Sequence, residues 1–343
     1  MVKIDRTEAL YEALKSRILL LDGGLGTMVQ RYGLQEEDYR GERFKDWEHR
    51  LKGCNDLLVL TNPKKILQIH EKYIAAGADI ITTDSFNANA ISLRDYGLEA
   101  YAREISKEAA KVARQAADSA FEKNPHRVRF VAGSMGPTNR TSSMSADVQN
   151  PASREVTFEE LTAAYMEQAE GLVEGGADLL LVETVFDTLN AKAALFAIAE
   201  LEERLGRKIP TMLSGTLADA GRTLSGQTVE ALYYSVSHFD LLSIGFNCAF
   251  GAKQLLPYLE RMAKVADFRI SAHPNAGLPN VMGGYDETPE MFARDVEEYL
   301  KRGVINIVGG CCGTTPEHIF ELRKIVDNYK PREVAPRKRE MVL

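Results

Sequence analysis

Cysteine is scarce in this sequence, with four residues in 343. So few thiols in a chain of this length do not form a disulfide scaffold, and clustered cysteines in a reducing compartment favour metal binding or catalysis. No apolar run approaches the ~18 residues that a membrane span requires, and residues 1–6 (MVKIDR) contain no apolar signal segment. We therefore expect a cytoplasmic protein with no membrane partner.

An excess of positive charge is also missing. The formal net charge is −7, the pI is about 5.6, and the densest basic cluster is RKR at 337–339. Electrostatic contact with nucleic acid depends on a basic patch or stripe. We predict no nucleic-acid partner and interpret 337–339 as part of a solvated linker.

Eight short apolar runs, each followed by small or polar residues, dominate the remaining pattern. They span 18–24, 78–86, 128–136, 177–185, 209–217, 241–249, 269–277 and 305–313. Near-continuous apolar runs are typical of parallel strands that are buried on both faces. Helical segments lie between the runs, with N-cap residues before Pro63, Pro289 and Pro316 and with terminating glycines.

Eight strands that alternate with helices predict a (β/α)₈ TIM barrel. A doubly wound sheet is the main rival, but no Gly-x-Gly-x-x-Gly turn follows the first strand. The segments 25–60 and 137–156 are long, and we interpret both as polar loops after strands. Such loops lie at the C-terminal face of a barrel, where active sites are built.

Three of the four cysteines lie at the ends of two predicted strands. Cys248 ends the sixth run in GFNC, and Cys311 and Cys312 follow the eighth in GGCCG. The ends of parallel strands share one rim of a barrel, so these thiols should meet there. Neighbouring strand residues point to opposite faces, so the chain must bend at the pair, and the three glycines permit this. We predict a zinc site on this rim, with an open fourth position.

Other interpretations of the cysteines stay open. Cys311 and Cys312 could form a buried apolar pair or a strained disulfide. A closed, non-catalytic zinc module would need a fourth protein ligand such as Cys54 or His273, although Cys54 otherwise reads as a structural cysteine. A zinc hydrolase is disfavoured because thiolates dominate and no histidine-rich motif is present.

Zinc that is held by three thiolates suits a particular reaction. Three negative ligands make the metal a poor Lewis acid, so generating hydroxide is not its natural task. A substrate thiol in the fourth position would lose its proton at neutral pH, although a free thiol has a pKa of about 8.5. We therefore expect alkyl transfer to a zinc-bound substrate thiolate, with no protein nucleophile.

Polar groups at other strand ends are candidate substrate contacts. Asp22 ends the first run and Glu183 the fourth, and a substrate ammonium group needs such partners. Each carboxylate could instead cap a helix or pair with a core arginine. Gly23 could bring its backbone N–H close to a substrate carboxylate. Ser134 and Asn247 are further candidate donors.

Together these motifs resemble the homocysteine S-methyltransferase family. The resemblance rests on DGGLGT at 22–27, GFNC at 245–248 and GGCCG at 309–313. Within the family, TTDSFNAN at 82–89, GSMGP at 133–137 and PNAGLP at 274–279 are most similar to the cobalamin-dependent methionine synthases. The similarity extends from residue 20 to about residue 322.

The resemblance implies that the three cysteines bind zinc and that the homocysteine sulfur takes the fourth position. It assigns Asp22, Gly23 and Glu183 to the amino-acid end of homocysteine. In the cobalamin-dependent members this barrel is the first module. We accordingly expect a barrel over 1–330, a linker over 331–343, and a downstream folate-binding module. Cobalamin would be carried by another module, and its methyl group would reach homocysteine from there. Stand-alone family members that use betaine or S-methylmethionine are the nearest rivals.

Overall fold

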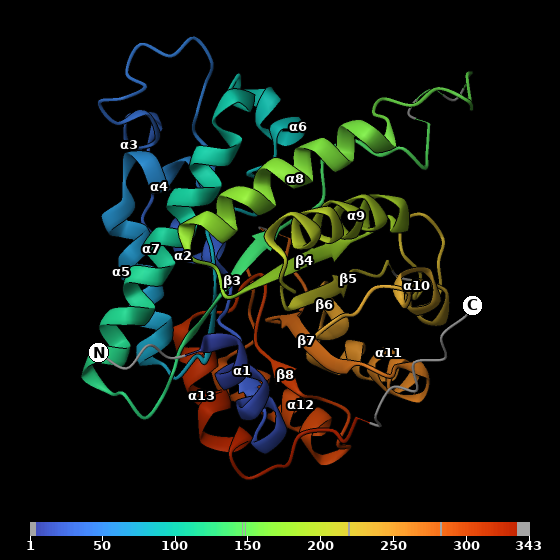
Figure 1. Cartoon of the computed structure of the whole chain (residues 1–343). Helices are drawn as coiled ribbons and strands as arrows, with labels where there is room; N and C mark the ends of the chain where they lie inside the picture. The colour runs from blue at the N-terminus through green and yellow to red at the C-terminus, as the bar shows by residue number, and fades with distance from the viewer. Residues whose placement is uncertain (1–4, 146, 148, 219, 282, 335–343) are drawn as a thin grey trace.

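Eight parallel strands and their connecting helices form a (β/α)₈ barrel in the computed structural model, which describes residues 5–145, 147, 149–218, 220–281 and 283–334 (Figure 1). The strands are β1 (Leu19–Leu20), β2 (Ile80–Thr82), β3 (Phe130–Met135), β4 (Leu179–Val185), β5 (Thr211–Gly215), β6 (Ser243–Gly251), β7 (Arg269–Asn275) and β8 (Ile307–Val308). They pair in the order β1-β8-β7-β6-β5-β4-β3-β2. A parallel bridge between Leu21 and Ile80 joins β1 to β2 and nearly closes the barrel. The predicted fold is confirmed.

Helices surround the strands (Figure 1). The outer ring consists of α5 (Pro63–Ala75), α7 (Ala102–Lys123), α8 (Phe158–Gly175), α9 (Thr188–Leu205), α10 (Val229–Val236), α11 (Ala252–Val265), α12 (Pro289–Lys301) and α13 (Pro316–Val326). Proline occupies the first turn of α5, α12 and α13, as the sequence predicts. Thr157 and Glu160 form a capping box at the start of α8, and Gly176 ends that helix with φ 100°.

The segment 25–60, predicted as a polar loop, instead contains four short helical segments. It contains α2 (Leu25–Arg31), α3 (Glu36–Arg40), the 3₁₀ turn η1 (Asn55–Leu57) and α4 (Leu58–Thr61). The prediction was wrong because widely spaced apolar residues, among them Tyr39, Phe44 and Leu51, are buried in the main core. The short helices α6 (Ala90–Leu93), η2 (Arg94–Tyr96) and η3 (Glu99–Tyr101) follow β2. The described part of 137–156 has no helix or strand and projects from the barrel (Figure 1).

The barrel interior has its own apolar cluster. Its strand residues alternate along the chain, as in Leu19 and Leu21 or Leu179 and Leu181. Leu10 and Leu14 of α1 (Arg6–Ser16) complete this cluster. Each is at most 2% exposed, and burying a leucine of this kind contributes about 2 kcal/mol. Helix α1 therefore closes the N-terminal end of the barrel and leaves the opposite rim for the site.

A repeated Gly-Ala-Asp sequence before β2 and β4 performs the same task twice. Asp79 accepts the N–H of Leu20 at 3.0 Å, and Asp178 accepts the N–H of Val131 at 2.8 Å. Each carboxylate thereby satisfies a donor of the neighbouring strand.

Among the described helices, none combines the length and apolar character that a bilayer crossing requires.

The expected linker begins against the barrel. Arg332 donates to the carbonyl oxygens of Phe268, Ala263 and Ala266, at distances between 2.9 and 3.0 Å. Residues 335–343 lie outside the described residues, including the basic cluster 337–339. The division into a barrel and a linker stays a prediction.

Candidate metal and substrate site

Cys311 and Cys312 lie in the turn that follows β8, which ends at Val308. The N–H of Cys311 donates to the carbonyl of Pro274 at 2.8 Å, and the N–H of Cys312 donates to Oδ1 of Asn275 at 3.2 Å. Both acceptors belong to the end of β7. The turn is therefore fixed by its neighbouring strand before any ligand binds.

The glycines of this turn mainly allow neighbouring parts of the chain to pack closely against its backbone. Only Gly313 of the three has a positive φ, 80°. A Cβ at Gly309 would lie 2.7 Å from the carbonyl oxygen of Asp22, and one at Gly310 would lie 2.4 Å from Oγ1 of Thr314. The motif thus permits the bend at Gly313, tight packing of Gly309 against the Asp22 turn, and tight packing of Gly310 against Thr314.

Cys248 lies at a bulge within β6. Its φ is 58° and that of Ala249 is 57°, and the β6–β7 register shifts between Asn247 and Gly251. Non-glycine residues rarely adopt this left-handed conformation, and each such position costs about 1–3 kcal/mol. The bulge places the Cys248 thiol beside the two cysteines that follow β8.

The three sulfurs fit a tetrahedral metal site. All lie within 4.8 Å of one another, and Sγ of Cys248 is 3.7 Å from Sγ of Cys312. Two ligands that are each about 2.3 Å from a tetrahedral metal lie about 3.8 Å apart. A set of three thiols matches the preference of zinc for soft sulfur ligands. The arrangement could therefore hold Zn²⁺ and leave one position for another ligand.

The cluster also stabilises negative sulfur. Hydrogen bonds from Cys311 and Cys312 lower the pKa of the Cys248 thiol. The same interaction with Cys248 raises the pKa of Cys311. The thiolate form of Cys248 is therefore stabilised by two neighbouring thiols, and this negative sulfur favours binding of a soft cation.

Asn247 is buried behind the cysteines, and its carboxamide is fully engaged. Its Oδ1 accepts the N–H of Thr184 at 2.9 Å and the hydroxyl of Ser214 at 2.7 Å. Its Nδ2 donates to Oγ1 of Thr184 at 2.7 Å and faces Sγ of Cys311 at 3.9 Å. Asn247 thus supports the cluster, and a direct substrate contact stays a prediction.

Asp22 lies directly after β1, on the same rim. Its carboxylate accepts the N–H of Thr82 at 2.8 Å and the Thr82 hydroxyl at 3.0 Å. Burial raises its pKa well above the usual range, and the charge of Glu183 raises it further. The Asp22 carbonyl accepts the N–H of Gly310 at 3.0 Å, so the Asp22 turn and the cysteine turn are joined. A Cβ at Gly23 would lie 2.7 Å from Oγ1 of Thr314, so its backbone lies against the same turn.

Glu183 on β4 is the second carboxylate of the rim. Ser134 on β3 donates its hydroxyl to Oε1 of Glu183 at 2.5 Å. Burial raises the pKa of Glu183 to about 7, and the charge of Cys248 also acts upward. Across the part of the chain that the structure describes, neither Asp22 nor Glu183 forms a salt bridge. A cationic group of a ligand would meet two carboxylates that lack a partner cation.

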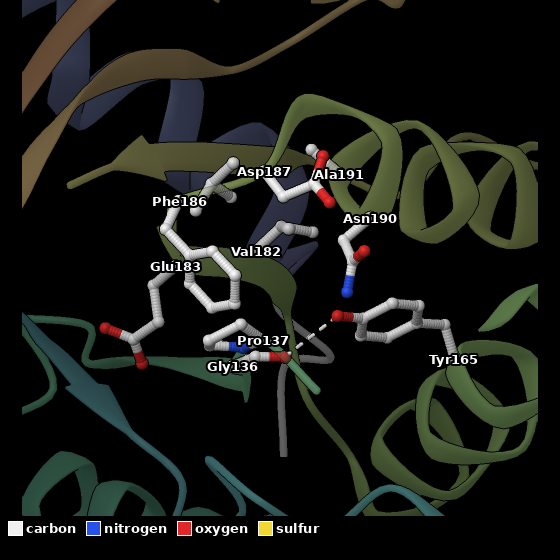
Figure 2. A pocket seen from close by; sticks show the side chains of 10 residues that line it. Gly136, Pro137, Tyr165, Val182, Glu183, Phe186, Asp187, Asn190 and Ala191 are labelled. Atoms are coloured by element: carbon white, nitrogen blue, oxygen red, sulfur yellow. Dashed lines mark hydrogen bonds between the residues drawn. The ribbon is translucent and has the colours of Figure 1, made fainter. Parts of the chain in front are cut away.

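A small enclosed cavity behind Glu183 is not the substrate site. Its volume is about 10 Å³, enough for one water molecule, and Tyr165, Asn190 and Asp187 line it. Figure 2 shows the Glu183 carboxylate pointing away from Asn190 and Tyr165, with Pro137 between them. Glu183 therefore forms one edge of this cavity while its charged group faces elsewhere.

The structure gives no support to a fourth protein ligand from Cys54 or His273. Among the described residues, the only group of metal-ligating side chains is Cys248, Cys311 and Cys312. Cys54 is buried in the core, and burial raises its pKa far above the ordinary value. His273 is buried on β7, and burial lowers its pKa to about 4.

These observations define a (β/α)₈ barrel with three clustered thiols that could hold a metal, and with the carboxyl groups of Asp22 and Glu183 on the same C-terminal rim. The family model described as homocysteine S-methyltransferase matches residues 19–326, and the chain belongs to this family. The family expected from the motifs is therefore confirmed.

Solved structures agree with the fold. The homocysteine methyltransferase MmuM from Escherichia coli, in its metallated form, has a TM-score of 0.71 and 23% identity, covering 93% of this chain and 99% of that chain. Its oxidised form has a TM-score of 0.71 and 24% identity, covering 94% of this chain and 99% of that chain. Its apo form has a TM-score of 0.67 and 23% identity, covering 93% of this chain and 99% of that chain. At these identities the likeness establishes the fold alone.

Three residues near the cluster escaped the sequence reasoning. Thr184 has φ 56°, and no residue type signals its bulge. Asn275, which accepts the Cys312 N–H, lies inside PNAGLP but had no role assigned. Tyr285 packs on Gly313. It lies ten residues beyond the end of β7, and only the fold brings it to the cysteines.

Proposed function

We propose that this chain activates homocysteine as a zinc-bound thiolate for S-methylation to methionine. The observation that carries the proposal is the spacing of three thiols, including the 3.7 Å between Cys248 and Cys312. The buried Asp22 and the half-buried Glu183 lie on the same rim. Zinc bound there would lower the pKa of the substrate thiol and keep it nucleophilic at neutral pH. The attacking sulfur then belongs to the substrate, and the protein supplies no nucleophile.

The chain's own residues orient the substrate. Cys248, Cys311 and Cys312 hold the metal, and we assign Asp22 and Glu183 to the substrate ammonium group. Burial raises the pKa of both carboxyl groups, and an arriving ammonium would favour their ionised form and pair with it. Ser134 fixes the Glu183 carboxylate, and Gly23 lies next to Asp22 where its backbone can meet the substrate carboxylate. The Asn247 amide faces the Cys311 sulfur and accepts the N–H of Thr184, which holds the bulge there.

The methyl donor is a finer part of the proposal. We infer methylcobalamin, carried by a cobalamin-binding module and reloaded by a folate-binding module. The segments TTDSFNAN, GSMGP and PNAGLP, which resemble the cobalamin-dependent methionine synthases, support this choice. Betaine and S-methylmethionine are the alternatives. A cytoplasmic location and the barrel–linker division at residue 330 belong to the same proposal.

A zinc and turnover assay tests the function. Wild-type protein and the Cys311→Ser variant are assayed for bound zinc and for methionine formation from homocysteine with methylcobalamin, betaine or S-methylmethionine. We expect one zinc per wild-type chain, and turnover with methylcobalamin. The variant should lose both metal and activity. Turnover that persists without zinc would overturn the mechanism, and turnover with betaine or S-methylmethionine alone would overturn the choice of donor.

A further inference from the structure

The Asp22 turn (residues 22–27) and the cysteine turn (residues 309–314) are bonded to each other. Three hydrogen bonds, which we call the junction, run between them: from the N–H of Gly310 to the carbonyl of Asp22 at 3.0 Å, from the N–H of Gly24 to Oγ1 of Thr314 at 3.0 Å, and from the N–H of Gly313 to Oγ1 of Thr27 at 2.9 Å. Gly310 precedes Cys311, and Gly313 follows Cys312. The cysteine pair is therefore tied to the Asp22 turn on both sides.

Thr314 is the central residue of the junction. Its hydroxyl accepts the N–H of Gly24 and donates to the carbonyl of Cys311 at 2.6 Å, so one side chain bonds to both turns. The hydroxyl of Tyr73 on α5 lies 3.2 Å from the carbonyl oxygens of Gly24 and Thr314. Thr314 and Tyr73 are fully buried. A Cβ at Gly24 would lie 2.6 Å from the Cys311 carbonyl oxygen, so the two backbones are in direct contact.

The proposed substrate would bridge the two turns. Its sulfur would bind a metal at the cysteine turn, and its ammonium group would meet Asp22. A ligand that is held at both ends binds tightly only when its length matches the distance between its two partners. The junction fixes that distance before a ligand arrives, because neither turn can shift without breaking hydrogen bonds to the other. Homocysteine has two methylene groups between its sulfur and its α-carbon, and cysteine has one.

We propose that the junction selects the chain length of the amino thiol, with Thr314 and Thr27 as positioning residues. The inference rests on the proposed function, because it takes the cysteines as metal ligands and Asp22 as a partner of the ammonium group. Each threonine acts by holding the cysteine turn at a set distance from Asp22. One methylene group more or less changes recognition at a fitted site by about 10- to 200-fold.

Calorimetry tests the proposal without using turnover. Zinc-loaded wild type, Thr314→Val, Thr27→Val and Thr314→Ser are titrated with cysteine, homocysteine and 2-amino-5-mercaptopentanoate, which has one more methylene group. Bound zinc is measured in every sample, and wild type is also titrated without zinc. The reference ligand is 2-aminobutyrate, which keeps the amino-acid end and lacks the sulfur. Thr27 is half-buried, so its variant tests the junction even where Thr314→Val does not fold.

Thr211→Val is the matched control protein. Thr211 is also fully buried, and its hydroxyl donates to the carbonyl of Ile209 at 2.9 Å, at the start of β5 and away from the rim. Wild type, Thr211→Val and Thr314→Ser, which keeps the hydroxyl, should prefer homocysteine over both other thiols by about tenfold or more. In Thr314→Val and Thr27→Val this preference should fall at least about threefold, while the affinity for 2-aminobutyrate stays that of wild type.

A preference equal to that of wild type in both Thr314→Val and Thr27→Val would overturn the role of the junction and leave the proposed function intact. The same loss of preference in Thr211→Val or Thr314→Ser would also overturn it, because the loss would not depend on the junction hydroxyl. An equal loss of affinity for 2-aminobutyrate and homocysteine would do so as well. A wild type whose affinity for homocysteine does not depend on zinc would overturn the proposed function itself.

Discussion

The carboxamide of Asn247 holds Thr184 by two hydrogen bonds, one from the Thr184 N–H at 2.9 Å and one to its hydroxyl at 2.7 Å. Thr184 and Cys248, the residue after Asn247, both have left-handed backbone, with φ of 56° and 58°. Strained positions of this kind persist only where the surroundings hold them. One buried amide therefore supports two bulges, one beside Glu183 and one at a cysteine.

Asn247→Ala should weaken both the fold and the metal site. The substitution leaves the buried Thr184 N–H and the Ser214 hydroxyl without their acceptor, so the free energy of unfolding should fall by about 3 kcal/mol. Urea denaturation measures this change, and chelator competition should show weaker zinc binding. Asn306→Ala is the control, because Asn306 bonds the N–H of Ile270 and the carbonyl of Arg332. It should lose stability but keep its zinc affinity; an equal loss of affinity in both variants would contradict the account.

Glu183→Gln should weaken homocysteine binding without removing zinc. A charge-assisted hydrogen bond is worth about 1.5–3 kcal/mol, so the Kd should rise about 10- to 100-fold. Calorimetry on the zinc-loaded protein measures it. The control ligand is 4-mercaptobutyrate, which keeps the thiol and carboxylate but lacks the ammonium group. The variant should bind this ligand at least as well as wild type does, and a matching loss for both ligands would argue against an ammonium contact.

Glu183 should also make stability depend on pH in a defined direction. Its pKa in the folded protein is about 7, because of burial, and about 4.3 in an unfolded chain. Between these values the folded state keeps a proton that the unfolded state has lost, so stability falls as pH rises through the window. Metal-free wild type should lose up to about 3 kcal/mol between pH 4.5 and 8 relative to Glu183→Gln. Urea denaturation measures the free energy of unfolding of both proteins at each pH. A difference between the two proteins that stays the same at every pH would contradict the assignment.

Gly309→Ala should destabilise the barrel by forcing two turns apart. Its new methyl group would lie 2.7 Å from the Asp22 carbonyl oxygen and from Cβ of Leu21. Overpacking of this kind costs about 1–3 kcal/mol. Gly26→Ala is the matched control, because position 26 in α2 has only Nδ2 of Asn55 within 4 Å, at 3.8 Å. That change should be neutral or stabilise by up to about 1 kcal/mol, and thermal unfolding distinguishes the two variants.

The barrel and the cysteine cluster were predictable because their signals are local. Apolar runs fall on all eight strands, and prolines and glycines mark the ends of helices. Cys248 lies in the C-terminal half of β6, Cys311 and Cys312 follow β8, and the C-terminal ends of parallel strands lie on one rim. The helices of 25–60 were missed because each is short and non-helical segments separate most of them. Helices of this length are marginal on their own, so burial of side chains such as Tyr39 of α3 in the main core stabilises them.

The remaining parts of the site depend on long-range contacts. The bulge at Cys248 is stabilised by Asn247 and by its partners on other strands, which no spacing in the sequence reveals. The Gly-rich turn suggested backbone freedom, yet Gly309 is constrained by the carbonyl of Asp22, far away in sequence. Tyr285 reaches the cluster only through a reversal of the chain between β7 and α12.

X-ray absorption at the zinc edge tests the central claim most directly. Zinc-loaded protein is measured without homocysteine and with a saturating amount, with binding verified by calorimetry on the same samples. The account predicts three zinc–sulfur contacts from Cys248, Cys311 and Cys312 and a fourth, also at about 2.3 Å, once homocysteine is bound. A sulfur count that stays at three when homocysteine is bound would contradict it.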